Sequence, residues 1–419
     1  MVSRKKRTGE EYRPLSVLFI ADGSLERPLL HSQGLPLLRW LRRKGRWCSV
    51  LSFESKLPEA NNALRCALES EGIVWLPLVI RGGASSWRQR LQMICGGIGA
   101  AINLCRRRAV DVVHCRSYRP AIVGGILKTL LGCGFIFDMR GFLIDEQVLA
   151  GRWRPGTIKY RLGRWAERWA LLRADAVVTT SPQFRERVLN LPYFPSSRAA
   201  QVVSIPNCVD VQRYRLLPGE QRLAFRSSQG WTDRLVVVFS GEGRPWDDIA
   251  RVVSFFSAVK QVQPHAYLLL LIHGQPAKVL KQVEAMLGMQ DYCLLSVEPT
   301  QMPMYLGAAD IGTLFLKRDA LTQAIASPIK FAEYLACGLP VALNGGIGDT
   351  ERIVRQYRVG VVVDADPTAE RYSAEQLVHW LQTDSGLQQR CRLAAENELS
   401  LDYACGLYEQ LYYRVKMQR

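Results

Sequence analysis

The chain has 419 residues, 48% of them hydrophobic and 22% charged, which excludes a disordered chain, a collagen-like repeat or a coiled coil as its overall description. At this length two or three domains are expected. The formal net charge is +17, and the whole excess lies in residues 1–210, because acidic and basic side chains balance in residues 211–419. The 11 cysteines form no C-x-x-C pair, which indicates reduced thiols in a cytoplasmic protein.

Short apolar runs alternate with helical patterns along the first half of the chain. The helix expected at residues 32–44 places Leu35, Leu38 and Leu41 on one face. Continuous apolar runs of this length are typical of strands that are buried on both faces of a parallel sheet. The strands expected in this half are residues 16–20, 49–53, 73–77, 111–115, 135–139 and 176–180.

A second series of strands follows, at residues 235–240, 267–273, 311–316, 339–343 and 360–363. Repeated strand–helix alternation predicts an α/β fold with parallel sheets, and the number of strands favours two tandem Rossmann-like domains facing across a cleft. We expect a basic tail at 1–14, an N-terminal domain at 15–210, a C-terminal domain at 211–395 and a helical segment at 396–419 that packs back on the N-terminal domain. The linker is placed at 206–217. Ligands are expected beyond the carboxyl ends of the strands.

Residues 327–341, SPIKFAEYLACGLPV, carry the most informative pattern. Ser327 is a good N-cap and Pro328 suits the first helical position, so a helix begins here and offers its positive dipole end to an anion. Lys330 adds a full charge, and Glu333, one turn on, is suited to accept hydrogen bonds from a ribose diol. These features favour a nucleotide diphosphate site. The alternative is a capped helix that carries a surface Lys–Glu pair.

The same segment resembles the donor-site signature of GT-B glycosyltransferases, in particular the retaining family-4 group. Four more segments are similar to motifs of that family and occur in the same order. They are ADAVVTTS at 174–181, IPNCVD at 205–210, MYLGAADIG at 304–312 and NGGIGD at 344–349. The resemblance spans roughly residues 15–415. It implies a transferase that binds a nucleotide-sugar with its C-terminal domain and an acceptor with its N-terminal domain.

The resemblance also implies roles for individual donor-site residues. Arg244 and Lys330 match the basic side chains that stabilise the leaving diphosphate, so no metal is expected. The match extends to Glu333 as the ribose-binding carboxylate. The further donor-binding residues are Gly23, Gly241 and Ser327. No cofactor is expected, since the nucleotide diphosphate sugar is a substrate.

Four residues of the N-terminal domain are candidates for binding the acceptor: His31, His114, Arg116 and Arg140. Arg140 is also a candidate catalytic residue, because it stands where many members of the family have a histidine. His114 ends a predicted strand, and a packed core histidine is the alternative for that position. Two further departures from the family pattern are Ile325, where a second glutamate is common, and Ile249, where a lysine is common.

Two other patterns have competing interpretations. Asp364 and Asp366 form a D-x-D match, which we interpret as a solvated loop rather than a metal site. Between residues 152 and 173 tryptophans alternate with arginines, and Trp165, Trp169 and Leu172 share one helix face. That face predicts either an ordinary core helix or a helix lying on anionic lipid.

The sequence thus predicts a cytoplasmic glycosyltransferase that moves a sugar, with retention, from a nucleotide-sugar to a glycan or lipid-linked acceptor in polysaccharide or glycolipid assembly. An anionic membrane surface is a candidate partner, which would place the enzyme peripherally on the inner face of the cell membrane. The alternative is a divergent, non-catalytic basic protein that binds membrane or nucleic acid. No nucleic-acid recognition motif accompanies the basic half, so nucleic acid is not the expected partner.

Overall fold

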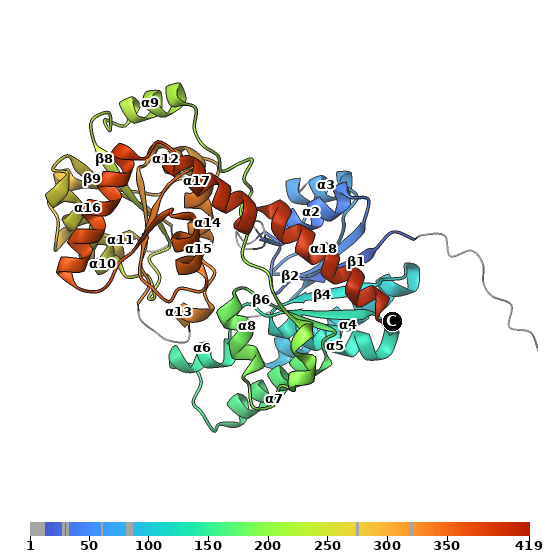
Figure 1. Ribbon diagram of the computed structural model, residues 1–419. Helices are drawn as coiled ribbons and strands as arrows, with labels where there is room; N and C mark the ends of the chain where they lie inside the picture. The colour runs from blue at the N-terminus through green and yellow to red at the C-terminus, as the bar shows by residue number, and fades with distance from the viewer. Residues whose placement is uncertain are drawn as a thin grey trace, which may run out of the picture. The chain divides into compact units, whose positions relative to one another are not determined.

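The computed structural model describes residues 13–26, 30, 33–59, 62–80, 87–273, 276–317 and 322–419. They form two compact units, shown in Figure 1. Unit 1 takes in the described parts of 1–179 together with 188–203 and 405–419, and unit 2 takes in 180–187 and the described parts of 204–404. The chain passes from unit 1 to the main part of unit 2 at residue 204, just before the predicted linker. The predicted basic tail, residues 1–14, lies almost wholly outside the described residues.

Unit 1 is built on a seven-stranded sheet with the order β3-β2-β1-β4-β5-β6-β7. Its strands are β1 (Ser16–Ile20), β2 (Trp47–Glu54), β3 (Val74–Val79), β4 (Val112–Arg116), β5 (Gly134–Asp138), β6 (Ala176–Thr179) and β7 (Val202–Ser204). The central strands are buried throughout, and β1 pairs in parallel with both β2 and β4. Burial on both faces explains why these strands read as continuous apolar runs.

Helices connect the strands of unit 1 and cover its sheet. They are α2 (Leu35–Arg43), α3 (Ala63–Ser70), α4 (Trp87–Arg107), α5 (Tyr118–Leu131), α6 (Leu143–Leu149), α7 (Ile158–Arg173) and α8 (Pro182–Leu189). Apart from α8, which divides between the two units, they belong to unit 1. None of the helices among the residues described here is long and apolar enough to cross a bilayer.

Unit 2 contains a six-stranded sheet with the order β10-β9-β8-β11-β12-β13. Its strands are β8 (Leu235–Gly241), β9 (Ala266–Ile272), β10 (Tyr292–Leu295), β11 (Ile311–Leu314), β12 (Val341–Leu343) and β13 (Gly360–Val362). Alternate residues of β8 enter different cores: Val236 and Val238 pack on one face of the sheet, and Val237 and Phe239 on the other. The prediction of two parallel-sheet α/β domains is therefore confirmed.

The helices of unit 2 lie on both sides of this sheet. They are α9 (Gly219–Ser228), α10 (Ile249–Val262), α11 (Pro276–Glu284), α12 (Met302–Ala308), α13 (Thr322–Ile325), α14 (Ile329–Ala336), α15 (Thr350–Tyr357), α16 (Pro367–Thr383) and α17 (Leu387–Ala394). One core contains residues of α12, α14 and α17, and the other contains residues of α10 and α16. The sheet is thus covered on each face, as a parallel sheet requires.

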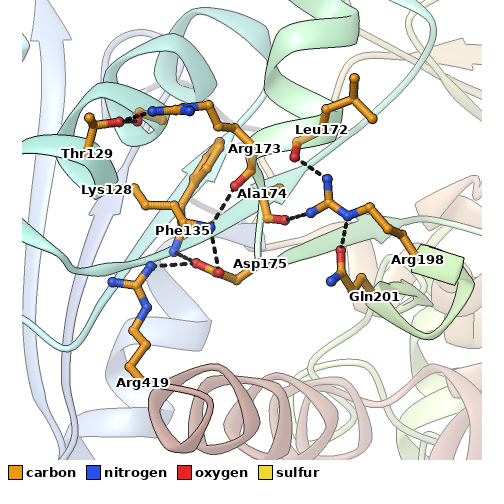
Figure 2. A network of polar contacts seen from close by, with 11 residues as sticks. Lys128, Thr129, Phe135, Leu172, Arg173, Ala174, Asp175, Arg198, Gln201 and Arg419 are labelled. Carbon is orange, nitrogen blue, oxygen red and sulfur yellow. Dashed lines mark hydrogen bonds and ion pairs between the residues drawn. The ribbon is translucent and has the colours of Figure 1, made fainter. Parts of the chain in front are cut away.

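The last helix, α18 (Leu401–Met417), returns to unit 1, as the sequence predicts. Glu409 pairs with Arg46 at 2.8 Å, and the terminal Arg419 pairs with Asp175 at 2.8 Å. Figure 2 shows that Asp175 also accepts from Lys128 Nζ at 2.6 Å and from the backbone N–H of Phe135 at 2.9 Å. The end of the chain is therefore held on the sheet of unit 1 by charge and by hydrogen bonds.

Candidate active site

In unit 2 the loop that follows β8 is fixed in place by backbone hydrogen bonds. This loop, residues 242–248, leads into α10, which Asp248 caps with its side chain. Trp246 O accepts from Lys317 N at 2.9 Å, and Asp248 N donates to Phe315 O at 3.0 Å. Both partners follow β11, the neighbour of β8 in the sheet. The loop is therefore held at the carboxyl end of the sheet, where ligands bind in proteins of this class.

The ammonium group of Lys330 lies against this loop. Its Nζ donates to Asp247 Oδ1 at 3.1 Å and lies 4.1 Å from the centroid of the Phe239 ring. A Cβ atom at Gly241 would come within 3.1 Å of that nitrogen, so glycine leaves the ammonium room against the backbone. Burial lowers the pKa of Lys330, and the carboxylates of Asp247 and Glu333 oppose that shift.

Asp247 is the member of this cluster that the sequence analysis did not single out. Its Oδ2 accepts from the backbone N–H of Arg244 at 2.9 Å, while its Oδ1 holds Lys330. The side chain of Asp247 is only 5% exposed. One buried carboxylate therefore positions both residues that the sequence assigns to the leaving diphosphate.

The Arg244 side chain is held differently from its backbone. Its guanidinium forms two hydrogen bonds with the carboxylate of Glu242, at 2.9 and 2.6 Å, and lies 5.2 Å from the Trp246 ring centroid. Both members of this ion pair are about half exposed, at 47% and 53%. Exposed pairs contribute about 0–1 kcal/mol. Arg244 can therefore exchange Glu242 for an anionic ligand at little cost.

The start of α14 differs from the prediction at one residue. The N-cap is Pro328, and among the described residues no side chain caps the helix. Ser327 is not the cap, because its hydroxyl accepts from the backbone N–H of Asn207 at 3.0 Å and its carbonyl from Asn207 Nδ2 at 2.6 Å. The Pro-Asn motif thus fixes the start of α14 and leaves the dipole end of the helix to an anion. Gly338, with φ of +79°, ends the helix as expected.

Glu333 lies one turn after Lys330, near Arg213 and Tyr214 in the segment between β7 and α9. Burial raises the pKa of Glu333, whereas a hydrogen bond with Tyr214 and the charge of Arg213 lower it. The neighbouring Tyr334 is fully buried, and its hydroxyl accepts from the backbone N–H of Ser240 at 2.8 Å. This bond ties α14 to the end of β8.

The two apolar departures from the family pattern are buried in unit 2. Ile249 is the first residue of α10, is 3% exposed and belongs to the core that includes Phe255. Ile325 ends α13, is 5% exposed, and its carbonyl accepts from the Thr180 hydroxyl at 3.0 Å. Neither side chain offers a polar group to a ligand, whereas Lys330 and Arg244 lie near enough for the charge of Arg244 to act on Lys330.

The residues expected to bind the acceptor belong to unit 1. His31 lies outside the described residues. Gly23, which was expected to bind the donor, also belongs to unit 1, where it has φ of +130°, a conformation that favours glycine, in the loop after β1. His114 and Arg116 end β4, and Arg140 follows β5. Since β4 and β5 are neighbours in the sheet, the last three are brought together at its carboxyl end.

A buried carboxylate, Asp138, organises these three side chains. Asp138 is fully buried, and its Oδ2 accepts from Arg140 at 2.8 and 3.1 Å and lies 3.6 Å from Arg116. The charge of Arg140, a hydrogen bond with His114 and the charge of Arg116 hold the pKa of Asp138 well below its usual range, against the opposing effect of burial. Arg140 also donates to the Tyr408 hydroxyl of α18 at 3.1 Å. Its side chain is 19% exposed, whereas that of Arg116 is 6% exposed.

His114 is enclosed completely. In the neutral tautomer that satisfies both contacts, Nε2 donates to Asp138 at 3.2 Å and Nδ1 accepts from the Tyr412 hydroxyl at 2.6 Å. Burial lowers the pKa of His114; the hydrogen bond and the charge of Asp138 oppose this shift, and the charges of Arg140 and Arg116 reinforce it. With its ring fully buried and both nitrogens engaged, His114 would contact an acceptor only if this network opened.

The lowered pKa of His114 predicts a dependence of stability on pH. Because the pKa is lowered in the folded state, the unfolded state binds more protons than the folded state as the pH falls through the ordinary histidine pKa of 6.5. The free energy of unfolding should therefore fall as the pH drops from about 7.5 to about 5.5, approaching about 1.4 kcal/mol per pH unit. Urea unfolding at several pH values measures this slope. His114→Gln should flatten it, and the exposed control His379→Gln should not; equal slopes in the wild type and His114→Gln would contradict the assignment.

The D-x-D match lies just after β13. Asp366 accepts from the backbone N–H of Ala369 at 2.9 Å and so caps α16, and both aspartates are exposed. Within the described part of the chain, no three His, Cys, Asp or Glu side chains gather closely enough to hold a metal ion.

Comparison with known proteins gives one sequence family. Residues 33–208 match the family described as a glycosyl transferase 4-like domain. This range ends at the Pro-Asn motif and so covers most of unit 1. No curated protein matches the chain.

Solved structures match over nearly the whole chain. A glycosyltransferase from Rickettsia africae shares 14% identity over 96% of this chain and 99% of its own, with a TM-score of 0.70. Anabaena HepE, solved with UDP and glucose, shares 13% identity over 96% and 100%, with a TM-score of 0.69. WaaG, a glycosyltransferase involved in lipopolysaccharide biosynthesis, shares 11% over 94% and 99%, with a TM-score of 0.66. At these identities the similarity shows the fold, which is that of the GT-B glycosyltransferases.

Proposed function

We propose that this chain, a GT-B glycosyltransferase with a glycosyl transferase 4-like domain at residues 33–208, transfers a sugar from a nucleotide diphosphate donor to an anionic glycan or lipid-linked acceptor, with retention. The observation that carries the donor half of the proposal is the arrangement around Asp247. Its carboxylate binds the ammonium of Lys330, in the first turn of α14, and the backbone N–H of Arg244. Anabaena HepE, which has the same fold, has been solved with UDP and with UDP-glucose, which supports a donor of this kind.

The donor diphosphate would lie between the dipole end of α14 and the two basic side chains. Lys330 would hold one phosphate from its place against Gly241, and Arg244 would leave Glu242 to hold the other. Glu333 would accept hydrogen bonds from the ribose hydroxyls, as the sequence pattern predicts. Lys330 and Glu333 belong to α14, and Arg244 belongs to the loop after β8, which supports a donor bound between these two segments.

The proposed reaction proceeds on one face of the donor sugar. The bond between the anomeric carbon and the phosphate oxygen breaks, and the acceptor oxygen bonds to the same carbon from the same side. The acceptor proton passes to the leaving phosphate oxygen. Lys330 and Arg244 stabilise the negative charge that grows on the diphosphate, and this stabilisation lowers the barrier only because it is stronger in the transition state than in the ground state.

The acceptor is proposed to be anionic because of the charge distribution. The excess of 17 positive charges lies in residues 1–210, whereas residues 211–419, which hold the donor-site residues, are neutral overall. A donor diphosphate therefore does not account for the excess. Arg140 is the proposed contact with the acceptor, since its guanidinium is partly exposed while Asp138 and Tyr408 hold it in place.

A thermal-shift panel separates this proposal from the alternative of a non-catalytic basic binding protein. Nucleoside diphosphates should raise the melting temperature in a base-specific way and should do so at high salt as well. Stabilisation by heparin or nucleic acid alone, lost at high salt, would support the alternative instead.

We expect chelation to leave activity largely intact. The physical reason is that Lys330 and Arg244 supply the charge that a metal ion supplies in other transferases, while Asp366 caps a helix. The measurement is the rate of nucleoside diphosphate release with and without EDTA. Complete loss of activity, restored by manganese or magnesium, would show that a metal ion takes part.

A further inference from the structure

Helix α7 exposes one apolar stripe and buries a charged residue. Ile158, Leu162 and Trp165 lie one turn apart along the helix and form a single stripe, which we name the α7 stripe. Their exposed fractions are 78%, 60% and 63%. Of the face on which the core-helix interpretation rested, Trp165 is therefore exposed, whereas Trp169 packs on α5. Figure 1 shows α7 and the loop before it at the outside of unit 1.

The opposite face of α7 explains this orientation. Glu167 is fully buried, and its carboxylate accepts from Tyr118 at 2.6 Å, from Tyr193 at 2.9 Å and from Arg164 at 3.0 Å. Turning the α7 stripe inward would expose these partners and leave the carboxylate without its hydrogen bonds, which is costly for a buried charge.

The end of α7 is fixed as well. Arg198 donates to the carbonyl oxygen of Leu172, and to that of Ala174 at 2.5 Å (Figure 2). Trp169 packs closely on α5, since a Cβ atom at Gly125 would lie 2.5 Å from its ring. The helix is therefore held in one orientation, and the α7 stripe faces solvent because of the contacts on the other side.

The surroundings of the α7 stripe are strongly positive. Between residues 147 and 174 the only acidic residue is the buried Glu167, whereas seven residues are basic. Five of the basic side chains are exposed and pair with none of the carboxylates that the structure describes: Arg152, Arg154, Lys159, Arg161 and Arg168. An apolar stripe bordered by unpaired cations is the pattern of a helix that lies in the interface of an anionic bilayer.

We propose that the α7 stripe docks unit 1 on an anionic membrane surface, with Ile158, Leu162 and Trp165 inserted among the lipid chains and the surrounding arginines on the headgroups. A second copy of this chain fits this surface poorly, because a symmetric contact between two α7 helices would bring the arginines of both copies together. The anionic bilayer is the partner that complements both the apolar and the positive parts. This inference does not depend on the donor assignment, and its test involves no sugar transfer.

The test is co-sedimentation of the full chain with vesicles of phosphatidylcholine alone and with vesicles in which a third of the lipid is phosphatidylglycerol. Binding should require phosphatidylglycerol and should weaken in high salt. The triple substitution Ile158→Ser, Leu162→Ser and Trp165→Ser should weaken it by at least about a hundredfold. Arg161→Gln should weaken it about fivefold at low salt. Leu223→Ser, on α9 of unit 2, is a matched control at 62% exposure and should bind as the wild type does.

A second readout locates Trp165 in the bilayer. Lipids brominated in their acyl chains should quench part of the tryptophan fluorescence of the wild type. Trp165→Leu should keep the binding and lose most of that quenching, because leucine inserts but does not fluoresce. Unchanged vesicle binding in the triple variant would overturn the proposal. So would equal, weak binding to both kinds of vesicle, or a dimer in sedimentation velocity that the triple variant abolishes.

Discussion

Replacing Lys330 with methionine should lower kcat by about 10²–10³-fold while the KM for the donor changes much less. Methionine keeps most of the length and apolar surface of lysine but removes the ammonium that Asp247 holds beside Gly241. Charge on the diphosphate grows as the glycosidic bond breaks, so the loss falls mainly on the transition state. Steady-state rates of nucleoside diphosphate release at saturating acceptor measure the effect.

Lys260→Met is the matched control for this experiment. Lys260 also belongs to unit 2 and pairs with an aspartate, Asp291, at 2.5 Å. It lies on α10, outside the cluster around Asp247, and its replacement should leave kcat within about twofold. A Lys330→Met enzyme as active as the Lys260→Met control would remove Lys330 from the site.

The second large effect is expected on stability, at Asp138. Asp138→Asn keeps the shape of the side chain but leaves Arg116 and Arg140 without their buried countercharge. Removing one partner from a buried ion pair typically costs about 3–5 kcal/mol. Urea unfolding followed by circular dichroism should show the transition of unit 1 at lower denaturant. A bound nucleotide identifies the other transition, since it should stabilise unit 2.

The pH dependence of this effect has a definite sign. Because the pKa of Asp138 is lowered in the folded state, its contribution is present above the ordinary aspartate pKa of 3.8 and is lost as the pH falls through the lower, folded value. Glu375→Gln, which breaks an exposed pair with Arg371 on α16, should change stability by less than about 0.5 kcal/mol. An Asp138→Asn protein as stable as this control would mean that the three basic side chains do not depend on Asp138.

The central strands could be predicted because local composition determines them. Residues 16–20 form β1 with the predicted bounds, since a strand buried on both faces needs an unbroken apolar run. The shorter β7 and β10 were missed. They contain three and four residues, lie at the edges of their sheets, and have only one buried residue each, so neither gives a continuous buried run.

The site could be predicted only where it depends on neighbours in sequence. Lys330 and Glu333 are one helical turn apart, so their shared surroundings followed from the sequence. Asp247 pairs with Lys330, which lies 83 positions later, and no local pattern reveals that contact. Ser327 was assigned as a cap for the same reason, because its actual partner, Asn207, is 120 positions away.

The orientation of α7 shows a second reason why a structure cannot be predicted fully from its sequence. The sequence placed Trp165, Trp169 and Leu172 on one apolar face, but Trp169 packs on α5 while Trp165 is exposed and belongs to the α7 stripe. Whether the apolar face turns inward depends on the partners of Glu167, which come from α5 and from the segment after α8. A single buried carboxylate with three hydrogen-bond donors therefore decides the direction of the whole helix.

The most direct test of the donor site is a calorimetric titration with two ligands. The first is the nucleoside diphosphate that binds best, and the second is its 2′,3′-dideoxy analogue, which lacks the ribose hydroxyls assigned to Glu333. We predict that the wild type binds the first at least about tenfold more tightly, as a hydrogen bond to a charged group contributes about 1.5–3 kcal/mol. In Glu333→Gln most of this preference should disappear. An equal preference in both proteins, or none in the wild type, would contradict the placement of the donor at the start of α14.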